Sequence, residues 1–229
     1  MNSINSIQSV YNKILSNSIP SGNNTTSSNQ FVPPTITINN SDWSSPALSN
    51  GQAIVMESVT TITSSTTFTN LYSWDYDLVI SAQLSSGTGI NLILTNNVPG
   101  IVTELNTTHT QSLGLAFYYV QGSINVSQSI SFTTVGTYSL VFYAAPFQGN
   151  YAPYNASYTP SVQTLSASIG GSTLSPFSLT TNSAYTQYTM DFTIASTGNY
   201  TLSFLSACSD QSKNTALNLT AVSIVYLHA

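Results

Sequence analysis

Two stretches of this chain share one pattern: FTTVGTYSLVF at residues 132–142 and FTIASTGNYTLSF at residues 192–204. In each stretch a strand-like run is followed by a glycine, and then by a second run in which large apolar residues alternate with polar ones. Alternation with a period of two predicts a strand whose large side chains lie on one face. The two copies therefore predict two strand, glycine turn, strand units whose Tyr, Leu and Phe side chains enter a shared core.

The same strand-type alternation, with β-branched and aromatic residues between turn signals, extends over residues 35–229. No window in that region has a convincing helical stripe. Many short antiparallel strands at such spacing predict a sandwich or a barrel. We expect strands at residues 53–58, 60–69, 76–82, 90–95, 114–121, 124–132, 137–144, 162–169, 185–194, 200–206 and 216–227. The sequence thus predicts an all-β fold, an antiparallel β-sandwich of the jelly-roll type.

The amino-terminal segment has a different pattern. Its apolar residues are spaced by three and four positions, which predicts one apolar face of a short helix. About fifteen residues are marginal for an isolated helix in water, so this segment should become ordered only by docking or self-association; the alternative is a frayed terminus. The side chains expected to act as the tether are Ile4, Ile7, Tyr11 and Ile14.

Residues 16–34 are polar and end in two prolines, which is the composition of a linker or an arm. We therefore predict an amino-terminal tether and linker, a short helix or extended arm, over residues 1–34, and a jelly-roll domain over residues 35–229.

The composition excludes several classes of partner. Of 229 residues, 41% are hydrophobic but only 4% are charged, with two lysines and no arginine, whereas about 25% charged residues is typical. Neutralising even a few phosphates takes several basic side chains, so nucleic-acid binding and attachment to an anionic membrane are excluded. No apolar run approaches the length of a membrane span, and residues 1–18 lack the pattern of a signal peptide. The chain is expected to be made and kept in a cytosol.

The repeated pattern resembles that of galactose-binding-like and carbohydrate-binding-module jelly rolls. These domains have a glutamine-bearing strand, an aromatic-ended strand, Gly-x-Tyr-x-Leu-x-Phe, and a strand that ends in an Ile-Gly-like turn. The matching residues are Gln121, Gln128, Phe132, Gly136, Tyr138, Leu140, Phe142, Leu165, Ile169, Gly170, Tyr188, Phe192, Gly198, Tyr200, Leu202, Phe204, Val222 and Ile224. The resemblance covers residues 114–227 and implies a jelly roll. The cysteines of secreted members are absent, and Asn218 is the nearest match to the acidic or amide residue that often precedes the final strand.

The residues that enzymes of the common hydrolase types need are scarce. His109 lies in a threonine-rich stretch and His228 is the penultimate residue, so neither is expected to serve as a catalytic base. Asp75 and Asp77 are two positions apart and could hold Ca²⁺ through oxygen ligands. The simpler alternative is a pair of solvated turn acids. We predict no catalytic activity and no cofactor, with this weak calcium site as the one exception.

Aromatic residues give the better functional signal. A loop rich in amides and prolines contains Tyr151, Tyr154 and Tyr158, and a second cluster contains Tyr72, Trp74 and Tyr76. Such rings stack on the apolar faces of sugars while amides bind the hydroxyls, and such pockets need few charges. Tyrosine is equally common in contacts between subunits. We expect Tyr72, Trp74 and the three loop tyrosines to contact either a glycan or a neighbouring subunit.

Two hypotheses remain for the whole protein. In the first, which we favour, it is a structural component of a virus particle (a minor capsid, decoration or fibre protein). Its jelly roll is of the glycan-binding type, and it forms homo-oligomers or joins capsid proteins. In the second, it is an extracellular or cell-surface carbohydrate-binding module or adhesin. Jelly rolls serve many unrelated functions, so the fold does not decide between them.

Overall fold

The computed structural model describes residues 32–49, 51–61, 65–85, 88–96, 111–146, 159, 162–179 and 184–229. The chain divides into two compact units, Met1–Pro33 and Pro34–Ala229. The second unit contains twelve strands within the described residues. The predicted helix or arm in residues 1–15 lies outside the described residues, so it and the proposed domain boundary stay predictions.

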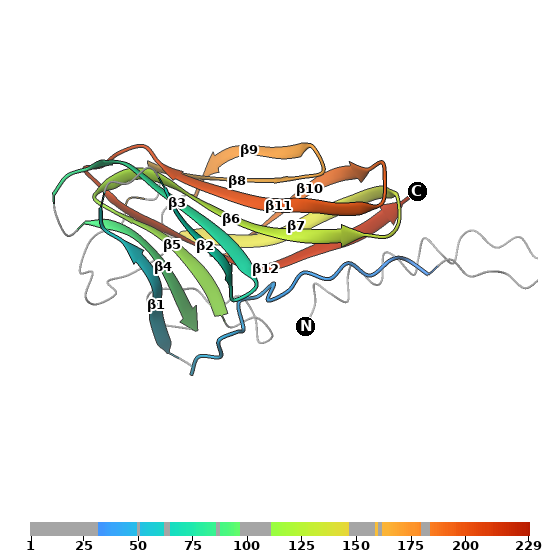
Figure 1. The fold of residues 1–229 in the computed structure, drawn as a ribbon, viewed down its shortest axis with the longest axis horizontal. Coiled ribbons are helices and arrows are strands. Elements are labelled where there is room, and N and C mark those ends of the chain that lie inside the picture. The colour runs from blue at the N-terminus through green and yellow to red at the C-terminus, as the bar shows by residue number, and fades with distance from the viewer. Residues whose placement is uncertain are drawn as a thin grey trace, which may run out of the picture. The chain divides into compact units, whose positions relative to one another are not determined.

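The strands form two six-stranded sheets (Figure 1). Sheet A has the order β1-β4-β5-β12-β7-β10, and sheet B has the order β2-β3-β6-β11-β8-β9; every paired strand is antiparallel. The prediction of an all-β antiparallel sandwich is therefore confirmed. The strands are β1 (Gln52–Val59), β2 (Thr66–Leu71), β3 (Trp74–Gln83), β4 (Gly89–Asn96), β5 (Gln111–Tyr118), β6 (Val120–Phe132), β7 (Gly136–Pro146), β8 (Gln163–Ile169), β9 (Ser172–Ser178), β10 (Thr186–Ile194), β11 (Gly198–Cys208) and β12 (Asn214–His228).

The repeated sequence pattern forms the two connections that pass between the sheets at one end of the sandwich. The first copy joins β6 of sheet B to β7 of sheet A, and the second joins β10 of sheet A to β11 of sheet B. In each copy a tyrosine hydroxyl donates a hydrogen bond to the carbonyl oxygen four residues earlier, Tyr138 to Thr134 at 2.6 Å and Tyr200 to Ser196 at 2.8 Å. Such tyrosine corners fix the turn between two packed sheets.

The two copies also pack against each other. The rings of Phe132 and Tyr138 contact Phe192, with centroids 5.9 and 5.7 Å away. Farther along, Phe142 of the first copy meets Phe204 of the second at 5.1 Å in an edge-to-face arrangement. Aromatic pairs at these distances stabilise a core beyond the area that they bury. The prediction that the copies share one core agrees with these contacts.

Gly136 shows why each copy contains a glycine. Its φ angle is +144°, in the region that favours glycine, and Gly198 has a φ of +146°. A Cβ atom at Gly136 would also lie 2.7 Å from the carbonyl oxygen of His228. The turn therefore needs glycine for its backbone angle and for the close approach of β12.

The strand Ser172–Ser178 is absent from the strands expected from the sequence. It is an edge strand of sheet B, paired with β8 alone, and its register shifts between Leu165 and Ala167. Pro176 lies within it, and proline is tolerated in a sheet mainly at edges and bulges. The proline interrupts the alternation that would have revealed a strand.

Residues 34–49, which we call the strap, precede β1 and contain no strand. The strap places Trp43 in the core, where its ring stacks on Trp74 with the centroids 5.3 Å apart. No helix in the described part of the chain is long and apolar enough to cross a membrane.

Candidate functional site

The outward face of sheet B is covered by short uncharged side chains. Along β6, every second residue points away from the core and carries a hydroxyl or an amide, while the residues between them, such as Ile124 and Val126, are buried. The outward residues of β6 are Gln121, Ser123, Asn125, Ser127, Ser129 and Ser131. Because most of them are at least partly exposed, this face is open to a ligand.

The outward side of sheet A is different. All residues of β4 are buried, as are seven of the eight residues of β5. Asn218, in the middle of β12, is 0% exposed, and neither atom of its side-chain amide has a hydrogen-bond partner among the described residues. Its place in a buried strand makes it unsuitable as a surface contact. This burial does not extend over the whole of sheet A, because outward residues of its edge strand β10, such as Thr189 and Asp191, are exposed.

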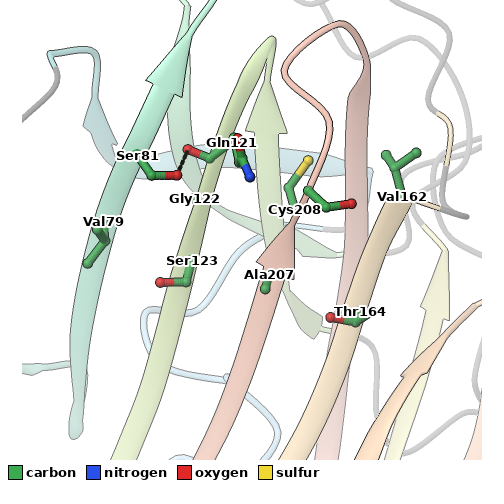
Figure 2. A pocket seen from close by; sticks show the side chains of 10 residues that line it. Val79, Ser81, Gln121, Gly122, Ser123, Val162, Thr164, Ala207 and Cys208 are labelled. Atoms are coloured by element: carbon green, nitrogen blue, oxygen red, sulfur yellow. Dashed lines mark hydrogen bonds between the residues drawn. The ribbon is translucent and has the colours of Figure 1, made fainter.

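A hollow of about 370 Å³ lies on sheet B where β3, β6, β11 and β8 run side by side (Figure 2). Its floor includes one row of cross-strand neighbours. Val79 pairs with Ser123, Ser123 with Ala207, and Ala207 with Thr164. Directly paired side chains on one face of a sheet lie about 5 Å apart. We call this hollow the trough; along its row, small apolar side chains alternate with hydroxyl-bearing ones.

The backbone fixes the shape of the trough at one end. A Cβ atom at Gly122 would lie 2.0 Å from the carbonyl oxygen of Val79, so only glycine permits β3 and β6 to approach at this point. The register of the two strands shifts between Ile80 and Ala82. Next to this bulge the Ser81 hydroxyl donates a hydrogen bond of 3.0 Å to the Gln121 carbonyl oxygen (Figure 2). Bulges of this kind re-aim the neighbouring side chains.

The described lining of the trough is uncharged. Among the described residues that line it, Cys208 is the one with an ionisable side chain. Burial raises the pKa of the Cys208 thiol, so the thiol stays neutral near pH 7. Val162, just before β8, and Ala207 on β11 supply apolar surface beside the hydroxyls of Ser123 and Thr164. The trough thus offers apolar patches and hydrogen-bonding groups, without charge, to a neutral ligand.

The structure separates Tyr72 and Trp74, two members of the second predicted aromatic cluster. Tyr72 is 36% exposed in the short turn between β2 and β3. Trp74 is 0% exposed, stacks on Trp43, and donates a hydrogen bond from its indole nitrogen to the Asn40 carbonyl oxygen at 3.2 Å. The expectation that Trp74 contacts a ligand or a subunit is therefore corrected, because strand alternation turns this ring into the core. Tyr72 remains a candidate surface contact.

Asp75 and Asp77 lie on the outward side of β3, as expected from their spacing. Each carboxylate already accepts a hydrogen bond from β2: Asp75 from the Asn70 backbone N–H at 2.6 Å and Asp77 from the Thr67 hydroxyl at 2.7 Å. These bonds join the hairpin formed by β2 and β3. No group of three or more His, Cys, Asp or Glu side chains that could hold a metal ion occurs in the described part of the chain. The calcium site stays a prediction.

Several predicted residues lie outside the described ranges. These are the tether residues Ile4, Ile7, Tyr11 and Ile14, the loop tyrosines Tyr151, Tyr154 and Tyr158, and His109. Their roles stay predictions. His228 ends β12 and is exposed.

Sequence reasoning did not find the trough. Its residues come from four strands that are far apart in the chain, and only the pairing of these strands brings them together. One signal was present: the run of alternating small polar residues over residues 121–131. A strand with apolar residues on one face and only hydroxyls and amides on the other indicates an exposed, uncharged sheet face.

No family model matches this chain, and no curated protein matches it. Among solved structures it is similar to TmCBM61 in complex with β-1,4-galactotriose, at 10% identity over 67% of this chain and 88% of that chain, with a TM-score of 0.46. It is also similar to the adhesin domain of Epf from Streptococcus pyogenes, at 10% identity over 86% of this chain and 66% of that chain, with a TM-score of 0.42.

A third similar structure is the enzymatically active domain of tailspike protein 4 of bacteriophage CBA120. The identity is 13%, the match covers 68% of this chain but only 19% of that chain, and the TM-score is 0.44. Carbohydrate-binding modules are thus among the solved structures that this chain is similar to, as the sequence resemblance indicated. At such low identities and TM-scores these likenesses carry no conclusion, and the ligand has to follow from the residues of this chain.

Proposed function

We propose that this chain is a non-enzymatic binding protein that recognises a neutral saccharide in the trough of sheet B. The observation that carries this proposal is the lining of the trough, in which small apolar groups and hydroxyls alternate without a charged side chain. A pyranose ring has the same character, because its C–H faces are apolar and its rim is made of hydroxyls. Sites that bind such ligands combine apolar surface with a few polar groups that fix the orientation.

The trough is shallow, and none of the described residues that line it is aromatic. A single site of this kind should bind weakly, because little apolar area is removed from water. Several linked copies would bind much more tightly than one, since the second contact becomes intramolecular. This reasoning favours a protein that is displayed in many copies on an outer surface.

We place that surface on a virus particle, with the protein as a decoration, fibre or minor capsid component. The near absence of charge and the tether-like pattern of residues 1–34 support this location. The alternative is a carbohydrate-binding module or adhesin at a cell surface. Detection of the protein in purified particles supports the first location; its presence only in culture supernatant or on cells contradicts it.

The trough can be tested by filling it. Ala207→Trp places a large ring on the floor of the trough. On a glycan array, this variant should no longer bind the neutral glycans that the parent protein binds. Leu205→Trp is the matched control, because Leu205 is an outward residue of the same strand, is 44% exposed, and does not line the trough. The control should retain binding. A parent protein that binds no neutral glycan, or an Ala207→Trp variant that binds as the parent does, contradicts the proposal.

The tyrosine loop supplies a second, independent contact in this proposal. Replacing Tyr151 and Tyr154 by alanine should reduce glycan binding if the loop contacts sugar, and should disrupt the oligomer if it contacts a subunit. Thermal stability should change little in either case. A double variant that fails to fold would show that these rings belong to the core, and both roles would then be wrong.

A further inference from the structure

The strap, residues 34–49, is held on the sandwich largely through hydrogen bonds to its main chain. The Gln128 side chain binds both backbone groups of Asn39: its amide nitrogen donates to the carbonyl oxygen at 3.0 Å, and its oxygen accepts from the N–H at 2.9 Å. Gln111 does the same for other strap residues. Its oxygen accepts from the Leu48 N–H at 2.8 Å, and its nitrogen donates to the carbonyl oxygens of Trp43 and Pro46 at 2.6 and 3.0 Å.

Three further bonds reach the main chain of the strap from three different strands. The Asn96 amide of β4 donates to the Leu48 carbonyl oxygen at 2.7 Å. The Val222 N–H of β12 donates to the Ser41 carbonyl oxygen at 2.9 Å, and the Trp74 indole of β3 donates to that of Asn40 at 3.2 Å. The sandwich thus forms hydrogen bonds with the backbone of a segment that forms no strand. Proteins that bind extended peptides do the same: main-chain hydrogen bonds supply affinity, and pockets for side chains supply specificity.

Specificity in the strap comes chiefly from Trp43. Its side chain is fully buried, and its ring stacks on Trp74 at an interplanar angle of 19°. Ile36, Ile38 and Leu48 are partly buried against the same core. In peptide complexes, the residue that dominates the binding energy is typically a fully buried aromatic side chain surrounded by weaker contacts.

Hydrogen bonds within the strap stabilise part of its conformation. The Asn40 side chain accepts a hydrogen bond from the Ser45 N–H at 2.9 Å and donates one to the Ser45 carbonyl oxygen at 2.8 Å. The Trp43 N–H donates to the Asn40 carbonyl oxygen at 3.1 Å. A segment that is ordered locally loses less entropy on docking. Immediately before β1, Gly51 has a φ of +78°, and its N–H donates a hydrogen bond of 2.8 Å to the Asn96 carbonyl oxygen.

From these contacts we infer that the slot formed by Gln111, Gln128 and Trp74 is a peptide-binding site, occupied in this chain by its own strap, and that it accepts the strap of a second copy. The slot binds the strap through main-chain hydrogen bonds and selects it through the Trp43 side chain, and every copy of the chain offers the same groups. Exchange of an identical element between copies is a low-cost route to oligomers, because the same contacts form in cis and in trans. The occupant in trans is residues 34–49 of a neighbouring chain.

The slot can be tested in the full chain by inserting a protease site after Ser49 and cleaving the folded protein. The cleaved strap should remain bound and should exchange with a fluorescently labelled synthetic peptide of residues 34–49. A peptide with Trp43→Ala should bind at least about tenfold more weakly, corresponding to about 1.4 kcal/mol. Unfolding of the sandwich on cleavage, or equal binding of both peptides, would overturn the inference that the strap is a separable ligand.

Exchange between copies can be tested by complementation. One full-chain variant carries Trp43→Ala, which weakens its strap, and the other carries Gln111→Leu and Gln128→Leu, which weaken its slot. Mixed together, they should form a heterodimer in which the intact strap of one occupies the intact slot of the other, and excess parental peptide should dissociate it. A mixture of folded variants that stays monomeric would refute exchange. Should either variant fail to fold, differently tagged parent chains replace them, and absence of mixed oligomers after prolonged incubation near the unfolding midpoint would refute exchange equally.

Discussion

Truncation of Leu202 to alanine tests whether the repeated sequence pattern builds the core. Leu202 lies on β11 opposite Gln128, is 0% exposed, and belongs to the same buried cluster as Leu140 of the first copy. Full burial of a leucine side chain contributes roughly 1.5 to 3 kcal/mol. The cavity left in a packed core adds to this loss, so Leu→Ala at a buried site costs about 2 to 5 kcal/mol. We expect about 3 kcal/mol for Leu202→Ala and for Leu140→Ala.

The measurement is denaturant unfolding of each variant, followed by its thermal midpoint. For a domain of this size, about 3 kcal/mol should lower the midpoint by roughly 6 to 12 °C. Leu205→Ala is the matched control, because it removes the same atoms from the same strand but on the outward face, where Leu205 is 44% exposed. The control should change the free energy of unfolding by less than about 0.5 kcal/mol. If both buried variants also lost less than about 0.5 kcal/mol, the shared core would be wrong.

Four other outcomes follow from the structure. Gly122→Ala should destabilise the protein by more than about 1 kcal/mol, because its Cβ would clash with the Val79 carbonyl oxygen at 2.0 Å; a thermal midpoint equal to that of the parent would contradict this. Cys208 should react with iodoacetamide at pH 8 at least about tenfold more slowly in the folded than in the urea-unfolded protein, because burial raises its pKa; equal rates would place the thiol at the surface. Burial also raises the pKa of Tyr76. Since Cys208 and Tyr76 lose their protons at lower pH in the unfolded chain than in the folded one, the free energy of unfolding should fall as pH rises above about 8.5 for Cys208 and above about 10 for Tyr76. A denaturant midpoint that stays constant to about pH 11 would refute this. Deleting residues 1–33 should leave a folded sandwich that no longer joins its oligomer or particle, as judged by circular dichroism and sedimentation; normal assembly of the truncated chain would remove the tether hypothesis.

The sequence predicted the strands best where alternation was regular and glycine turns were unambiguous. The stretches 132–142 and 192–204 became the β6–β7 and β10–β11 connections. Alternation failed at β9, where Pro176 interrupts it, and at residues 60–69, which were expected as one strand, whereas the structure begins β2 at Thr66. Edge strands make fewer packing contacts, so their sequences carry a weaker period-two pattern.

The candidate site was harder to predict than the fold. Trp74 was expected at the surface because it belongs to an aromatic cluster with Tyr72 and Tyr76. In a strand, however, neighbouring residues point to opposite faces, and Trp74 falls on the same inward face as Tyr76 and Leu78, all of which are fully buried. The aromatic cluster in the sequence is therefore split between two environments, and only Tyr72 keeps an accessible ring.

The sequence by itself determined the all-β class, the two tyrosine-corner units and the uncharged character of the surface. These properties depend on composition and on contacts between residues close together in the chain. Only the tertiary structure decided where the trough and the strap lie. The trough needs Val79, Ser123, Ala207 and Thr164 side by side through strand pairing, and the strap needs glutamines 63 to 89 residues away. Side-chain amides that bind a distant main chain leave no periodic signal in a sequence, because their partners are backbone groups that every residue carries.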